Sequence, residues 1–214
     1  MAKTYLEVNP SANILILEAA SSIGGVWAED RLYPELKSNN LLGTYEFSDF
    51  PMDPEIFGVN PGEHIPAEVM HNYLTYYAER FDLISRIRFE TKVNSAEYKG
   101  PGKWLIKVTR GFIDDNALES DEISTKRLVV ATGLTSEPFL PTFTGGEVFG
   151  APLFHSRDFL KYESTLETAK KVAVFGGSKS AWDAVYAYAS KGVQVDWIIR
   201  GEDANPLGHN NNIV

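Results

Sequence analysis

A run of small residues near position 176 has the composition of a phosphate-binding turn. Gly176-Gly177-Ser178-Lys179-Ser180-Ala181 follows an apolar stretch and precedes a helical one. It matches G-x-G-x-x-G/A except that Ser178 replaces the second glycine. The first glycine permits the tight turn, the small second residue lets a pyrophosphate approach, and N–H groups at the helix start bind phosphate oxygens. The run therefore predicts a dinucleotide site that includes Gly176, Ser178 and Ser180, with a turn of small packing residues as the alternative.

Arg200 bears on which dinucleotide would bind. It ends the next apolar strand, 24 residues after Gly176. An acidic residue here would bind the ribose hydroxyls of NAD, whereas an arginine can pair with the additional 2′-phosphate of NADP. Arg200 therefore favours NADP over NAD, and a plain surface charge is the alternative interpretation.

Glu18 ends another apolar run, residues 14–17, where dinucleotide folds place the carboxylate that binds a ribose. That carboxylate should follow a glycine-rich loop by about 20 residues. Counting back from Glu18 passes Met1, so we expect this first unit to lack its opening strand and its glycine-rich loop. The alternative is that Glu18 is a solvated strand end.

The hydrophobic pattern predicts the elements that would position these residues. Residues 2–7 resemble the end of a helix, and a helix begins at Pro66. Residues 28–64 have no periodic pattern, and a loop of that length is usually functional. The expected strands are buried parallel ones at 14–17 and 128–133, alternating ones at 87–98 and 103–109, and a strand, helix and strand at 172–175, 178–190 and 193–199.

These elements indicate an α/β fold with two dinucleotide-binding, Rossmann-like half-domains around a small antiparallel β insert, both half-domains being incomplete. Residues 112–124 are acidic and polar, which predicts a solvated loop or sheet edge. We expect residues 1–140 to form an FAD-type unit without its first strand, and residues 141–214 to begin an NADP-type unit.

Composition excludes several classes of function. The net charge of −9 argues against nucleic acid, and no segment approaches the ~18 apolar residues of a membrane span. With no cysteine, the chain has no disulfide scaffold, thiolate zinc site or redox dithiol. The histidines show no metal-ligand spacing, so we expect no metal and structural or surface roles for His64, His71, His155 and His209. No secretory leader is evident, which predicts a cytoplasmic protein.

Several motifs, in one order along the chain, resemble the flavin-containing monooxygenases, particularly fungal members related to N-hydroxylating and Baeyer–Villiger enzymes. Residues 18–27 resemble E-x(5)-G-G-x-W, residues 33–39 resemble Y-x(5)-N, and residues 47–51 contain S-D-F-P. Residues 128–133 resemble the A-T-G turn between the two nucleotide domains. Residues 149–159 resemble the fingerprint F-x-G-x(3)-H-x(3)-[YFW].

The resemblance implies an FAD- and NADPH-dependent monooxygenase that oxygenates a small organic substrate with O2 through a C4a-peroxyflavin. The cofactor would carry the chemistry while the protein orients the partners. Asn39 matches the family asparagine beside the reactive flavin edge, although Asn40 is an equally plausible neighbour. The resemblance assigns FAD contacts to Glu18, Gly24, Gly25, Trp27, Val93, Thr132 and Gly133, and NADP contacts to Gly176, Ser178, Ser180 and Arg200.

Two departures from the fingerprint bear on the subfamily. Ala151 replaces its glycine, and Phe159 replaces the terminal tryptophan of strict Baeyer–Villiger enzymes. We therefore favour N- or S-oxygenation or an atypical fungal enzyme. A disulfide reductase is rejected because it needs reactive cysteines. A short-chain dehydrogenase is rejected because the Y-x-x-x-K match at Tyr33 has Pro34 in its interior, which disfavours the helix that motif needs.

A non-catalytic protein is the other hypothesis. On this interpretation the chain is an inactive remnant, or a nucleotide-binding or interaction module. Since no loop for the FAD pyrophosphate is found, we expect the 214-residue chain alone to have little or no oxygenase activity.

Overall fold

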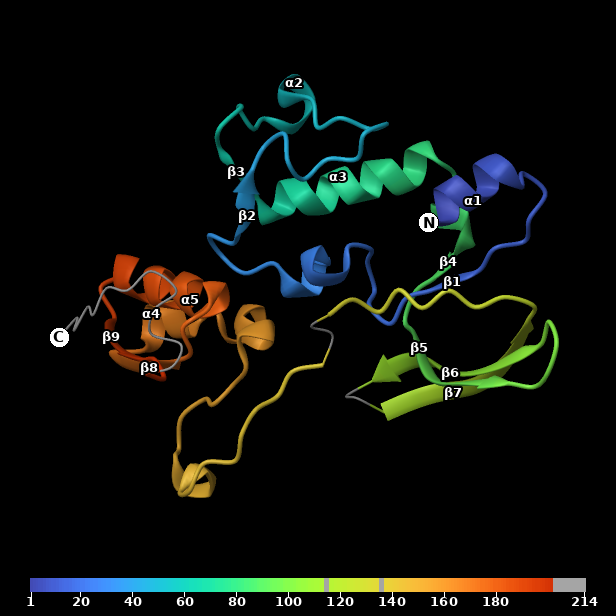
Figure 1. Cartoon of the computed structure of the whole chain (residues 1–214). Helices are drawn as coiled ribbons and strands as arrows, with labels where there is room; N and C mark the ends of the chain where they lie inside the picture. Colours follow the sequence, from blue (N-terminus) through green and yellow to red (C-terminus); the bar gives the residue numbers. More distant parts are fainter. Residues whose placement is uncertain (114–115, 135–136, 202–214) are drawn as a thin grey trace.

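The chain folds into an antiparallel sheet, a helix with long surrounding loops, and a separate C-terminal unit (Figure 1). The computed structural model describes residues 1–113, 116–134 and 137–201. No helix within these ranges has the length and apolar character needed to cross a membrane.

The N-terminal elements follow the predicted pattern in part. Helix α1 (Ala2–Val8) ends at Asn9, immediately before Pro10, as expected for the end of a helix. Only Ile16–Leu17 of the predicted strand forms β1, which pairs in parallel with β4 (Ile87–Arg88). The strand is half-buried rather than buried, because within the described residues β4 is its only paired neighbour.

A 14-residue helix, α3 (Ala67–Arg80), follows Pro66 as predicted and anchors the long loop before it. Tyr73 on α3 is fully buried. Its hydroxyl donates to the carbonyl oxygen of Phe50 at 2.6 Å and accepts the N–H of Phe47 at 2.7 Å. This one hydroxyl therefore fixes the S-D-F-P segment against the core that contains Met52, Val59, Ile65, Met70 and Tyr73.

The segment predicted as an unbroken loop contains short regular elements. Strands β2 (Lys37–Leu41) and β3 (His64–Pro66) pair antiparallel, and α2 (Pro54–Phe57) begins after the N-cap Asp53. The 3-10 turns η1 (Gly25–Trp27) and η2 (Glu29–Arg31) precede them. Elements of three to five residues are too short to give a periodic signal, which explains their absence from the prediction.

The antiparallel insert is confirmed. Strands β5 (Thr91–Tyr98), β6 (Trp104–Ile113) and β7 (Asn116–Thr125) form a three-stranded sheet in that order, after the 3-10 turn η3 (Ile84–Arg86). Residues 100–102 make the turn between β5 and β6, where the N–H of Lys103 donates to the Gly100 carbonyl at 3.0 Å. The acidic segment forms the edge strand β7.

The prediction of a buried strand at residues 128–133 is wrong. These residues have no regular structure, and the side chains of Val129 and Val130 are 64% and 72% exposed. A continuous apolar run indicates a buried strand only where neighbouring strands pair with it and both faces are covered. No described strand pairs with this segment.

The C-terminal unit is the predicted strand, helix and strand. Strands β8 (Lys171–Phe175) and β9 (Gln194–Ile198) pair in parallel, and α5 (Lys179–Ser190) connects them. Before them come the 3-10 turns η4 (Gly146–Val148) and η5 (Ser156–Tyr162) and the short helix α4 (Thr165–Thr168). The core of the unit consists of Phe159, Leu166, Ala187, Tyr188 and Val193 together with Tyr33 from the N-terminal half.

Candidate functional site

The glycine-rich turn joins β8 to the N-terminus of α5, which is where a dinucleotide fold binds phosphate. Gly176 has a φ of +129°, which side-chain-bearing residues rarely adopt. The N-cap residue of α5 is Ser178, whose side chain makes no capping hydrogen bond. The N–H of Ala181 donates to the Ser178 carbonyl at 2.9 Å. Because the first N–H groups of an α-helix lack partners within the helix, those of Lys179 and Ser180 can bind a ligand.

Arg200 lies beyond the same edge of the small parallel sheet. Phe175 and Ile198, the last residues of β8 and β9, are register partners, and the N–H of Gly176 donates to the Ile198 carbonyl at 3.0 Å. Arg200 follows two residues later and is exposed. The fold therefore brings Gly176, Ser178, Ser180 and Arg200 to one end of the unit.

Glu18 and the start of β5 are brought together at the end of β1. The backbone N–H of Thr91 donates to the Glu18 carbonyl at 2.9 Å, and Val93 follows two residues along β5. A register shift between Val93 and Ser95 marks an irregularity of the kind often found next to sites. The Glu18 carboxylate accepts the N–H of Ala20 at 2.9 Å through Oε1. Its second oxygen, Oε2, makes no hydrogen bond within the described part of the chain and is available for a ribose hydroxyl.

The Gly24-Gly25 turn has a structural explanation at one of its two positions. A Cβ on Gly24 would lie 2.8 Å from the carbonyl oxygen of Trp27, and φ is +118°. Gly25 has a φ of +60° but open space on its Cβ side, so a ligand can approach it. Trp27 packs against the core around Tyr73, and its carbonyl accepts the Nδ1–H of His71 at 3.0 Å. A packing role therefore accounts for much of Trp27.

Asn39 lies on β2 beside a buried anchor. Ser38, only 1% exposed, donates through Oγ to the Asn40 carbonyl at 2.5 Å and accepts the N–H of Ile65 at 2.9 Å. The Ser38 carbonyl accepts a hydrogen bond from His64 Nδ1 at 2.8 Å. These bonds fix the strand so that Asn39 lines a cavity that Asn40 does not line.

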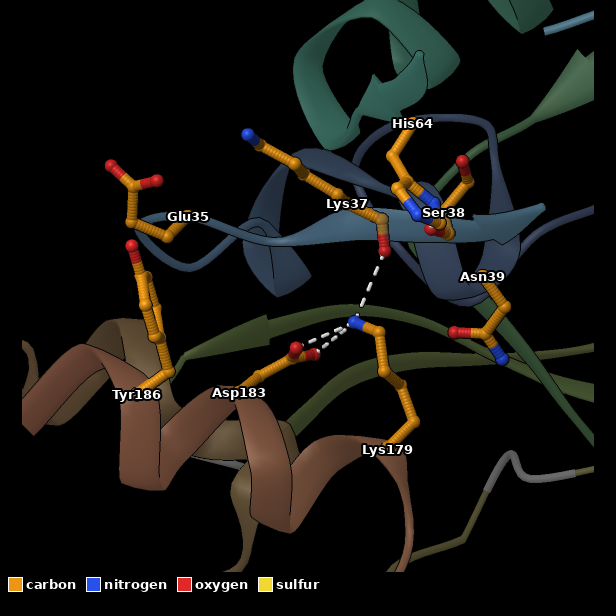
Figure 2. A pocket seen from close by; sticks show the side chains of 8 residues that line it. All are labelled: Glu35, Lys37, Ser38, Asn39, His64, Lys179, Asp183 and Tyr186. Carbon is orange, nitrogen blue, oxygen red and sulfur yellow. Dashed lines mark hydrogen bonds and ion pairs between the residues drawn. The ribbon is translucent and has the colours of Figure 1, made fainter. Parts of the chain in front are cut away.

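This cavity, of about 540 Å³, separates β2 from α5 (Figure 2). Figure 2 shows Asn39 and Lys179 on the same side of β2, facing the space between the two elements. The cavity thus connects the candidate Asn39 with the first turn of the helix that follows the glycine loop. Its lining residues are Glu35, Lys37, Ser38, Asn39, His64, Lys179, Asp183 and Tyr186.

Two charged residues of the cavity, Lys179 and Asp183, were not predicted from the sequence as functional residues. Lys179 Nζ lies 2.6 and 2.5 Å from the two carboxylate oxygens of Asp183, and Tyr33 Oη donates to Oδ2 of Asp183 at 2.7 Å. Burial, and then the hydrogen bond to Asp183, raise the pKa of Tyr33 well above its usual value, so the hydroxyl stays a donor. The i,i+4 spacing of Lys179 and Asp183 was the available sequence signal.

Thr132 and Gly133 are not brought to the other candidates by any hydrogen bond of the described chain. Both are exposed, and Gly133 has a φ of +75° with open space around it. The segment that leads to them passes α1, where Arg127 Nη1 donates to Tyr5 Oη at 2.9 Å.

The histidines of the described chain make structural hydrogen bonds. His155 Nδ1 accepts the N–H of Arg157 at 3.1 Å, and the rings of His64 and His71 bond backbone carbonyls. His209 lies outside the described residues. Within those residues no group of three or more His, Cys, Asp or Glu side chains is arranged to hold a metal ion.

Comparison with known proteins gives consistent matches. Residues 57–212 match the family model described as L-lysine 6-monooxygenase/L-ornithine 5-monooxygenase. The FAD-dependent monooxygenase rstn6 of Aspergillus nomiae is 39% identical over 96% of the chain, and the FAD-dependent monooxygenase of Pyrenophora dematioidea is also 39% identical over 96%. The chain spans 36% and 38% of the length of these two relatives.

Solved structures agree with this match. Tmm from Pelagibacter sp. strain HTCC7211 superposes with a TM-score of 0.77 at 26% identity, covering 98% of this chain and 49% of that protein. An oxidized steroid monooxygenase bound to NADP gives a TM-score of 0.68 at 27% identity, covering 92% and 35%. The expected α/β fold of Rossmann-like half-domains is therefore confirmed.

Proposed function

The chain belongs to the L-lysine 6-monooxygenase/L-ornithine 5-monooxygenase family, and we propose that the whole protein is an FAD- and NADPH-dependent monooxygenase. In the overall reaction NADPH supplies a hydride, one atom of O2 enters a small organic substrate, and the other leaves as water. Reduced FAD supplies the reactivity toward O2 when bound, and the residues of the chain bind and orient the reactants.

The observation that carries the proposal is the β8–α5–β9 unit. Its turn offers the N–H groups of the α5 N-terminus, and Arg200 lies at the same end of the sheet. We assign the NADP phosphates to Gly176, Ser178 and Ser180 and the 2′-phosphate to Arg200, within a domain that begins near residue 141.

Residues 1–140 would form the FAD side. The position of Glu18 beside the start of β5, the strand that carries Val93, supports a site for the adenosine part, with the carboxylate on the ribose. Gly25, with open space beside it, is the better of the two glycines for contact with the flavin. We assign Gly24 and Trp27 to support of that turn, and Thr132 and Gly133 to the crossing between the two domains.

Asn39 is the candidate for the reaction centre. Its amide lines the cavity that residues of α5 line from the other side (Figure 2). An amide can donate and accept hydrogen bonds without changing its charge, so it can orient a polar oxygen species without titrating. Asn39→Ala in the FAD-loaded whole enzyme should reduce product formed per NADPH consumed, whereas Asn40→Ala should not. Equal ratios in both variants would contradict the assignment.

The test of the NADP site is a matched pair of serine substitutions. Ser178 and Ser164 are both helix N-caps without side-chain capping bonds, of α5 and α4 respectively. Aspartate is a good N-cap, so Ser178→Asp and Ser164→Asp should both fold. Ser178→Asp places a carboxylate against the phosphates and should weaken NADPH binding by at least about tenfold, measured by calorimetry. Ser164→Asp should bind like the parent.

The same titration can reject the proposal. If the parent chain takes up no NADPH, or if both variants bind equally well, the glycine turn is a packing turn. The FAD side is tested separately by purifying the whole protein with FAD present and recording its visible absorbance after free flavin is removed. A protein-bound flavin spectrum supports the FAD assignment, and a colourless whole protein contradicts it.

A further inference from the structure

Tyr33 joins two parts of the molecule that lie far apart in the sequence. Its ring belongs to the core of the C-terminal unit and lies 5.4 Å from the Phe159 ring, centroid to centroid. Its hydroxyl donates to Asp183 Oδ2 at 2.7 Å, a separation of 150 residues along the chain. The segment before β2 is therefore docked on η5 and α5 through one aromatic side chain and its hydroxyl.

Lys179 makes the second connection. Besides the carboxylate of Asp183, its ammonium group donates to the backbone carbonyl of Lys37 at 3.2 Å (Figure 2). Lys37 is the first residue of β2, two residues before Asn39. One ammonium group therefore links the first turn of α5 to the strand that carries Asn39.

We propose that Tyr33, Lys179 and Asp183 are positioning residues that form a joint between the two nucleotide units and fix Asn39 relative to the glycine-rich turn. The joint does not depend on the proposed function, but its link to NADPH does. Other titratable groups around Asp183 and Lys179 in the cavity are Glu35, Lys37, His64 and Tyr186.

Physical reasons favour a joint over a chance surface pair. Contacts between domains of one chain are usually weak, and relative motion is the default unless specific bonds oppose it. The Asp183 side chain is only 15% exposed and satisfies both the Tyr33 hydroxyl and the Lys179 ammonium. Removing the Asp183 charge leaves the Tyr33 hydroxyl and the Lys179 ammonium with a weaker acceptor. The loss in free energy is large where water has limited access to replace it.

Such a joint should couple nucleotide binding at the glycine-rich turn to the position of Asn39. Lys179 is the first residue of α5, directly after the turn assigned to NADP phosphates. A nucleotide that orders this turn would order the Lys179–Lys37 contact as well. By reciprocity, a well-formed joint should favour nucleotide binding.

The absence of cysteine in the sequence permits a direct measurement of the joint. Asn72→Cys on α3 and Ala189→Cys on α5 are both at exposed positions and accept a pair of spin labels. The inter-label distance distribution, measured by pulsed EPR without nucleotide, reports relative motion of the two units. Tyr33→Phe and Asp183→Asn should each broaden it about twofold, as expected when a weak domain interface is released.

The matched controls separate positioning from general stability. Lys171→Gln removes a surface ion pair with Asp196 within the same C-terminal unit and should leave the distribution unchanged. Lys179→Met should broaden it, while Lys179→Arg, which keeps the charge and donors, should restore the parent width. Tyr33→Phe keeps the buried ring and Lys179 is 39% exposed, so these variants should stay folded by circular dichroism.

The measurements distinguish failure of the proposed joint from failure of the proposed NADPH site. Distributions that stay unchanged in Tyr33→Phe, Asp183→Asn and Lys179→Met would overturn the joint. NADPH should narrow the parent distribution and should do so less in Lys179→Met. Broadening in the variants together with no NADPH binding in the parent would reject the proposed function while leaving the joint standing.

Discussion

The indole N–H of Trp197 donates to the carbonyl oxygen of Gly176 at 2.7 Å. Strand β9 thereby holds the first glycine of the candidate phosphate turn. Trp182 of α5 packs edge-on against the same indole, with ring centroids 4.6 Å apart. Helix, turn and strand are thus connected through one side chain, which orders the turn before any ligand binds.

Trp197→Phe should therefore weaken NADPH binding while the unit stays folded. The substitution removes the donor but keeps an aromatic ring, and one lost hydrogen bond corresponds to about 1 kcal/mol, roughly a fivefold change in affinity. Isothermal titration with NADPH measures it. Trp182→Phe, which leaves the Trp197 bond intact, is the control, and equal affinities in both variants would count against this role.

Arg200→Glu should change the preference between nucleotides. A carboxylate can accept the ribose hydroxyls of NADH and repels the 2′-phosphate of NADPH. Loss of a charge-assisted bond corresponds to about 1.5–3 kcal/mol, so NADPH affinity should fall by about 10- to 100-fold, with a much smaller change for NADH. An unchanged ratio of the two dissociation constants would reject the 2′-phosphate assignment.

Gly24→Ala and Gly25→Ala should differ in stability although the glycines are adjacent. The new Cβ at Gly24 would collide with the backbone of Trp27, whereas at Gly25 only the left-handed backbone is strained. We expect losses of about 2–4 kcal/mol for Gly24→Ala and about 1 kcal/mol for Gly25→Ala. Urea unfolding of the two variants measures this, and a larger loss at Gly25 would contradict the structure.

Alkaline pH should destabilise the chain through its buried and half-buried tyrosines. Burial is the main cause that raises the pKa of Tyr33, Tyr73, Tyr77 and Tyr188 in the folded state. Above about pH 10 the unfolded chain loses these phenolic protons while the folded chain keeps them. Stability present below that pH should decline as the pH rises toward the folded-state pKa values.

Tyr33→Phe should lessen this decline because it removes one of the retained protons. Unfolding midpoints measured from about pH 9 to about pH 11 give the slope for parent and variant. Identical slopes would show that Tyr33 does not contribute in the way its hydrogen bond to Asp183 implies.

Local patterns in the sequence were sufficient for the C-terminal unit. The apolar runs at 172–175 and 193–199 and the small residues at 176–181 predict a parallel strand, helix and strand, which β8, α5 and β9 confirm. The same holds for α3 and for the β5–β6 hairpin around residues 100–102. In each case the determinant is short-range: periodicity, a turn residue or a helix start.

Whether an apolar segment forms a buried strand depended on neighbouring strands, which a local sequence pattern does not reveal. The run at 128–133 is as apolar as β8, yet it has no regular structure and Val130 is exposed, because no described strand pairs with it. Glu18 lies beside Thr91, two residues before Val93, only because β1 pairs with β4 and the chain then continues into β5.

For the candidate site, too, some features follow from local sequence and others only from the tertiary structure. Residue types at 18, 39, 176 and 200 pointed to nucleotide and flavin chemistry because motif spacing reflects local turns at strand ends. Only the tertiary structure distinguished Asn39 from Asn40, since which side chain lines the cavity depends on how Ser38 anchors β2. The Tyr33–Asp183 bond likewise joins residues 150 positions apart, and such long-range contacts are determined by packing of the whole chain.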